Sequence, residues 1–210
     1  SDPLAAPVVV NTNHYVCVGR NLNAIPKLDG MWNVNDYSAG ITTELKRYSV
    51  RGSNMMDYAK TWDQVDSMIL DSDDLGKRLG NHSPLAAELK ASDIPSMEFQ
   101  RQRVEAVCKL VMSKVKWNGK YALSPADPAE TLKKGEGSNA DINLLLIQSL
   151  AEVGVTATPV ILRTRDLGML PYNFPSIRKI STFLVGVILP GGSKAYLDAS
   201  SPSGSLNDIS

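Results

Sequence analysis

The chain has 210 residues, and its 22 Lys and Arg balance 22 Asp and Glu, so the formal net charge is zero. This balance argues against a dedicated nucleic-acid-binding protein, which is normally basic. Two Cys and two His exclude a disulfide framework and a Cys-rich zinc site. The longest apolar stretches, about ten residues, are too short to cross a bilayer, so no transmembrane segment is expected.

Residues 1–58 contain short strand-like runs at Pro7–Val10, Tyr15–Val18 and Ile41–Val50, separated by Asn, Gly and Pro. We therefore expect a β-rich N-terminal segment, or the end of a preceding module, over residues 1–58. A second domain is expected over residues 59–210. Because its polar tail stops without a structural terminator, we expect further sequence beyond it.

Two amphipathic helices are predicted in the first half of this second domain. The first begins after Thr61, where Trp62, Val65 and Ile69 share a face, and ends near residues 71–74. The second covers residues 97–116, with an apolar stripe of five residues, Val104, Val107, Cys108, Val111 and Val115. We expect it to end at Trp117-Asn-Gly119, where Asn and Gly allow a left-handed C-cap.

A third helix is predicted from about Asn139 to Val153, with Ser138 and Asp141 as a capping pair. Its apolar character nearly all round predicts that it is buried. Strands are predicted at Thr156–Thr164, Ile180–Leu189 and Lys194–Ala199, and the Pro-Gly-Gly-Ser turn at residues 190–193 should pair the last two antiparallel. Helices followed by strands indicate an α+β fold, with a central helix packed on an antiparallel sheet.

Several stretches resemble the transglutaminase-like superfamily, whose core is shared with papain-type cysteine proteases. They are Lys114–Gly119, Leu132–Leu146 with the helix and turn that follow to Ala157, the strand Thr156–Arg165, the strand Ile180–Val187, and Tyr196-Leu-Asp-Ala-Ser200. The resemblance covers roughly residues 60–200. It is closest to a bacterial subgroup in which a β-rich module of unknown function precedes the core, and it implies a periplasmic, envelope-associated or secreted protein.

The chemistry of that family rests on a Cys–His–Asp triad, with the thiol at the start of the core helix. The resemblance places Asn139 at the nucleophile position, Thr182 at the position of the His, and Asp198 at the position of the Asp. An amide nitrogen cannot attack a carbonyl, because its lone pair is delocalised, and Asn139 is instead a favoured N-cap residue. Thr182 cannot act as a general base near neutral pH. Two of the three triad positions are therefore lost.

Other candidates for chemistry have simpler interpretations. Ser138 is explained by capping, and Cys108 lies on an apolar helix face, where a free Cys behaves as a small hydrophobe. His14 and His82 stand in turn contexts and are expected to be solvated. The acidic run at residues 71–74 lacks the glycine and the glutamate of a calcium loop. We expect neither a metal site nor a cofactor.

The long loop at residues 166–177 has two interpretations. It can simply pack over the sheet, or Arg165, Tyr172 and Phe174 can form a binding lip for a peptide or glycan beside the former active site. The leading hypothesis is a catalytically inactive transglutaminase-like domain that serves as a binding or structural module of a larger bacterial protein. Its expected partners are a peptide or other extended ligand and flanking β-rich modules of the same chain. The alternatives are an amide-bond-processing enzyme that uses non-standard residues, and an architectural spacer.

Overall fold

The computed structural model describes residues 13–26, 28–41, 43, 45, 47–48, 56–57 and 61–201. The predicted strand Pro7–Val10 and much of Ile41–Val50 lie outside these residues. The helices are α1 (Trp62–Leu70), α2 (Ala86–Ala91), α3 (Gln100–Lys114), α4 (Pro128–Lys134) and α5 (Asn139–Glu152). The strands are β1 (Arg47–Tyr48), β2 (Met56–Asp57), β3 (Lys116–Trp117), β4 (Glu136–Gly137), β5 (Ala157–Leu162), β6 (Thr182–Ile188) and β7 (Lys194–Leu197).

The fold is α+β, as the sequence predicts, and its main sheet is an antiparallel three-stranded one in the order β5-β6-β7. Val160 pairs with Leu184 across the first ladder, and Val185 pairs with Leu197 across the second. The predicted turn between β6 and β7 is present. Gly191 and Gly192 both adopt positive φ, at +86° and +83°, which side chains other than glycine rarely tolerate.

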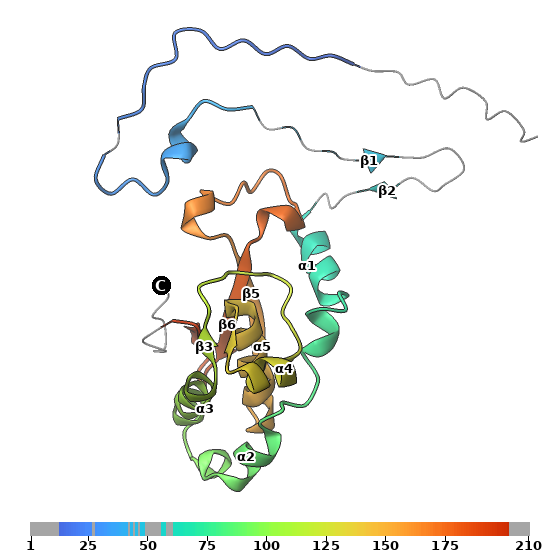
Figure 1. Cartoon of the computed structure of the whole chain (residues 1–210), viewed down its shortest axis with the longest axis vertical. Helices are drawn as coiled ribbons and strands as arrows, with labels where there is room; N and C mark the ends of the chain where they lie inside the picture. Colours follow the sequence, from blue (N-terminus) through green and yellow to red (C-terminus); the bar gives the residue numbers. More distant parts are fainter. Residues whose placement is uncertain are drawn as a thin grey trace, which may run out of the picture.

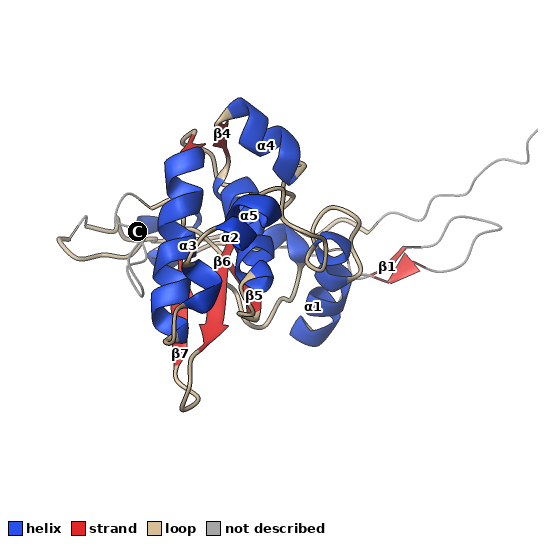
Figure 2. Ribbon diagram, turned by 90° about the horizontal axis from the view of Figure 1, so that it is seen from below, coloured by secondary structure: helices blue, strands red, loops and turns tan. Residues whose placement is uncertain are grey.

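Helix α5 lies at the centre of the molecule and contacts α2, α3, α4, β5 and β6 (Figure 2). Every residue from Asn139 to Leu150 is buried except Asp141, which confirms the burial predicted from its apolar sequence. The helix begins with the predicted capping box, in which Ser138 and Asp141 exchange side-chain and backbone hydrogen bonds. It ends at Glu152, and Gly154 follows two residues later with a φ of +74°, which suits a left-handed turn.

The two earlier helices occur where their periodicity predicts them. Helix α1 starts at a capping box between Thr61 and Gln64. Helix α3, however, ends at Lys114, before the predicted terminus, because Lys116 and Trp117 extend into β3 and pair in parallel with β4. The predicted C-cap at Gly119 is therefore wrong. Its φ of +82° shapes a turn after β3 instead.

Some elements were not predicted from the sequence. Helix α4 has a complete set of signals, with Asp127 as N-cap, Pro128 in the first turn and Gly135 as a left-handed C-cap. In the N-terminal part, the predicted strand Tyr15–Val18 is wrong, because these residues form no regular structure. A 3-10 turn at Val34–Tyr37 and the antiparallel pair β1 and β2 are the regular elements described there. The division at residue 58 stays a prediction. No helix in the described part of the chain is both long and apolar enough to span a membrane.

Candidate functional site

Asn139, Thr182 and Asp198 meet at the N-terminal end of α5. Asn139 is the first residue of that helix, Thr182 is the first residue of β6, and Asp198 directly follows β7. The side-chain amide of Asn139 donates from Nδ2 to the hydroxyl oxygen of Thr182 and also to the carbonyl oxygen of Phe183, at 3.3 Å. All three positions line one cavity of about 380 Å³. The structure thus brings together residues that lie far apart in the sequence.

Asn139 does not cap the helix, contrary to the interpretation of it as an N-cap residue. Ser138 is the cap, since its hydroxyl accepts from the Asp141 N–H at 3.2 Å. The Asn139 amide is therefore free to face the sheet, and its Oδ1 accepts from the Ala122 N–H at 3.1 Å. The backbone N–H of Asn139 donates to the Lys120 carbonyl oxygen at 3.1 Å. Both ends of the side chain are hydrogen-bonded, so Asn139 is a positioned polar group.

Asn143 is a member of the site that sequence reasoning missed. It lies one helical turn after Asn139 and therefore on the same face of α5, and its side chain is 0% exposed. Its Nδ2 donates to the Phe183 carbonyl at 3.0 Å and to Asp198 Oδ1 at 3.1 Å. Its Oδ1 accepts from the Ala199 N–H at 3.0 Å. A polar residue four positions after Asn139, directly before the apolar run Leu144–Ile147, was the signal that could have revealed it.

Asp198 is held by hydrogen bonds to amide and hydroxyl groups. Its Oδ1 accepts from Asn143, from the Ser200 N–H at 3.0 Å and from the Ser200 hydroxyl at 2.6 Å. The carboxyl is only 6% exposed, and a buried carboxylate requires such donors to offset its lost hydration. In a Cys–His–Asp site this carboxylate would orient an imidazole. Among the described residues, Asp198 Oδ1 accepts hydrogen bonds from Asn143 and Ser200 instead.

Neither cysteine lines the cavity. Cys108 is completely buried on α3, in agreement with its position on the apolar stripe. Burial, and secondarily the negative charge of Asp198, raise the pKa of its thiol to about 11. Because the thiolate is the nucleophilic form, Cys108 is inert near neutral pH. Cys17 is exposed in the N-terminal segment.

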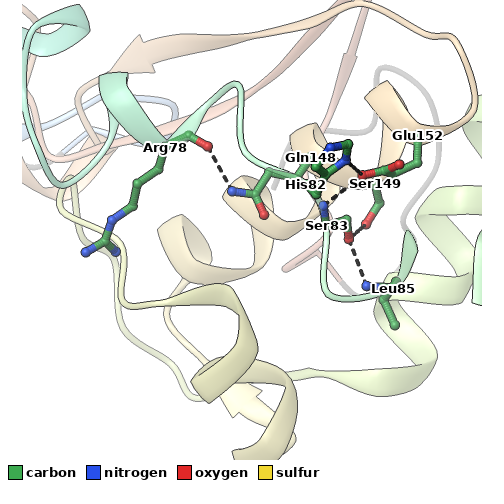
Figure 3. Close-up of polar contacts among 7 residues, drawn as sticks. All are labelled: Arg78, His82, Ser83, Leu85, Gln148, Ser149 and Glu152. Atoms are coloured by element: carbon green, nitrogen blue, oxygen red, sulfur yellow. Dashed lines mark hydrogen bonds and ion pairs between the residues drawn. The ribbon is translucent and has the colours of Figure 1, made fainter. Parts of the chain in front are cut away.

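His82 belongs to a polar cluster at the opposite end of α5 (Figure 3). Its Nδ1 lies 3.0 Å from Glu152 Oε1, which also accepts from the Ser83 N–H at 2.9 Å. The imidazole is 94% exposed, as a solvated histidine should be, although it has this one partner. The buried Ser83 hydroxyl lies 2.8 Å from that of Ser149, so it is not paired with the imidazole. The cluster therefore joins the turn at residues 82–85 to α5, roughly 20 Å from Asn139 at about 1.5 Å per residue.

The remaining candidates are placed as follows. Arg165 lines the cavity, whereas Tyr172 and Phe174 do not. The Tyr172 ring is exposed and packs edge-on against Trp62, with ring centroids 6.3 Å apart. The backbone carbonyl of Tyr172 accepts from the Trp62 indole N–H at 3.0 Å. In the acidic run Asp73 pairs with Lys77. Nowhere in the described ranges do three His, Cys, Asp or Glu side chains gather closely enough to hold a metal ion.

Comparison with known proteins adds no argument about the fold or the site. No protein-family model and no curated protein sequence matches the chain. A crystal structure described as a "putative protease" from Parabacteroides distasonis ATCC 8503 aligns with 63% of this chain, at 15% sequence identity and a TM-score of 0.39. The alignment covers 29% of that protein, so this chain spans less than a third of its length. The chemistry of the site therefore rests on its own geometry.

Proposed function

We propose that this chain contains a catalytically inactive transglutaminase-like domain whose cavity binds an extended, peptide-like ligand. The observation that carries the proposal is the direct hydrogen bond between Asn139 and Thr182 beside an open cavity. The family's nucleophile and base would occupy these two positions, and here an amide and a hydroxyl satisfy each other. An amide and a hydroxyl paired in this way cannot attack a ligand's backbone amides.

The cavity favours binding over a purely architectural role. Its volume of about 380 Å³ lies within the usual range for ligand pockets, and amide, hydroxyl, carboxylate and guanidinium groups all reach it. The domain would act within a larger bacterial, envelope-associated or secreted protein, beside β-rich modules of the same chain. An amide-processing enzyme with non-standard residues is the competing proposal, and the experiment below separates the two.

The test is to restore the two lost residues, with Asn139→Cys and Thr182→His in a Cys17→Ser background that removes the exposed thiol. At the N-terminus of α5 the helix dipole and the adjacent imidazole should lower the pKa of the introduced thiol well below its ordinary value of about 8.5. The rate of iodoacetamide alkylation between pH 5 and 9 measures that pKa. We expect an inflection at least one unit lower in the double variant than with Asn139→Cys alone.

The matched control combines Asn139→Cys with Thr182→Ala, which leaves a similar space without an imidazole. Equal alkylation profiles for all three variants would contradict the assignment of Thr182 to the base position. The unaltered chain should show no hydrolysis or acyl transfer on a glutamine-containing peptide. Turnover that disappears in Cys108→Ala would replace the proposal with the enzymatic alternative.

A further inference from the structure

The N-terminal segment at Met31–Asp36 lies against the loop that borders the cavity. In Figure 1 the blue helical turn of this segment stands next to the orange loop between β5 and β6. Hydrogen bonds join residues more than 130 positions apart in the sequence at both ends of the contact. The loop therefore binds, within the same molecule, a stretch of chain that leads into the 3-10 turn Val34–Tyr37.

Arg165 makes three of the contacts to this stretch. Its guanidinium lies 4.8 Å from the centre of the Trp32 ring, a cation–π geometry. Its Nε donates to the Trp32 carbonyl and its Nη2 donates to the Met31 carbonyl, both at 2.8 Å. Two of these contacts recognise main-chain atoms, which any extended peptide offers. The third recognises an aromatic side chain.

Asn33 and Asp36 supply the remaining contacts, through their side chains. Asn33 Nδ2 donates to the carbonyl oxygens of Arg165 and Asp166, at 2.9 and 2.8 Å. Asp36 Oδ1 accepts from the Met169 N–H at 2.9 Å. Gly168 permits this approach, since a Cβ there would lie 2.5 Å from Asp36 Oδ1 and the residue has a φ of +84°.

Trp32 also lines the cavity that contains Asn139 and Thr182. Its side chain is nevertheless 52% exposed, and all these contacts are made at the surface. A contact of this kind is weak enough to be exchanged for an equivalent one from another chain. The bound segment thus identifies the kind of peptide groups that can bind at the rim of the cavity.

We propose that residues 163–169 form a recognition surface for a peptide with an aromatic residue, an Asn directly after it, and a turn that carries an Asp three positions after that Asn. Residues 31–36 occupy this surface within the chain and compete with that peptide. The inference rests on the proposed function, because it names the ligand class of the same cavity. It requires no catalytic step.

The probe is a fluorescein-labelled peptide with the sequence of residues 28–38, and its binding to the full chain is followed by fluorescence anisotropy. We expect the variant Trp32→Ala with Asn33→Ala, whose own segment is released, to bind the peptide at least tenfold more tightly than the unaltered chain. In the unaltered chain, residues 31–36 are a tethered competitor with an effective concentration in the millimolar range, which accounts for a tenfold difference in affinity. Adding Arg165→Ala should weaken binding at least tenfold.

Arg178→Ala in the released background is the matched control and should change binding less than twofold, since this exposed arginine lies on the same connection. A labelled peptide with Trp replaced by Ala tests the aromatic contact without altering the protein's folding, and it should bind at least tenfold more weakly. Equal binding to the released and unaltered chains, or no loss with Arg165→Ala, would overturn the inference. The alkylation experiment is independent of these outcomes, so failure of the inference and failure of the proposed function can be told apart.

Discussion

Asn143→Ala should be among the most destabilising single substitutions in this domain. The change removes three hydrogen bonds in a completely buried place. The Phe183 carbonyl keeps a donor in Asn139, and Asp198 keeps Ser200, so those two losses cost about 1 kcal/mol each. The Ala199 N–H is left without its acceptor, which costs about 1–3 kcal/mol. The expected loss in the free energy of unfolding is therefore about 3–5 kcal/mol.

Urea denaturation followed by circular dichroism measures this loss. With a slope of about 2 kcal/mol per molar urea, typical of small domains, the midpoint should fall by roughly 1.5–2.5 M. Asn173→Ala is the control, because this exposed residue on the loop should shift the free energy by less than about 0.5 kcal/mol. A loss below about 1 kcal/mol for Asn143→Ala would show that the hydrogen bonds of the Asn143 amide do not stabilise the packing of α5 against the sheet.

Two further predictions concern titratable groups outside the cavity. A thiol reagent at pH 8 should modify exposed Cys17 and spare Cys108 until the chain is denatured, as mass spectrometry would show. Burial raises the pKa of the Cys108 thiol from 9.0 to about 11, so the stability that this thiol contributes is complete below pH 9 and is lost as the pH rises to 11. Between pH 9 and pH 11 the free energy of unfolding should therefore fall by about 2 kcal/mol more in the unaltered chain than in Cys108→Ala. Burial acts to raise the pKa of Glu152, but the Ser83 N–H and the His82 imidazole together hold it below its ordinary value of 4.5. The unaltered chain should therefore exceed Glu152→Gln in stability by up to about 1 kcal/mol at pH 7, and an equal difference at pH 3 would contradict the hydrogen-bonding role of the carboxylate.

Local signals in the sequence predicted the central elements well. The capping pair Ser138 and Asp141 and the paired glycines after β6 are short-range patterns, and each occurs where it was expected. The end of α3 was missed because the pairing of β3 with β4 is non-local, and a parallel ladder outweighs a local C-cap signal. Helix α4 was not predicted, although Asp127, Pro128 and Gly135 carry the cap signals that would have revealed it.

The site was harder to predict than the fold. A family resemblance indicated Asn139, Thr182 and Asp198, but the residue that bonds both Asp198 and the sheet, Asn143, has no motif of its own. The contact between Arg165 and Trp32 joins segments at opposite ends of the sequence, and nothing in either segment specifies the other. Long-range polar contacts of this type follow from the tertiary structure alone.

The burial of α5 on all sides has a consequence for folding during synthesis. A helix of this length is marginal alone in water, so it needs neighbours before it can persist. Helix α3 is synthesised earlier, but β6 leaves the ribosome only after the whole loop at residues 163–181, and β7 later still. The apolar residues of α5 therefore stay uncovered on one side until nearly all of the domain has emerged. The domain should then gain its cooperative stability only after β7 has left the ribosome.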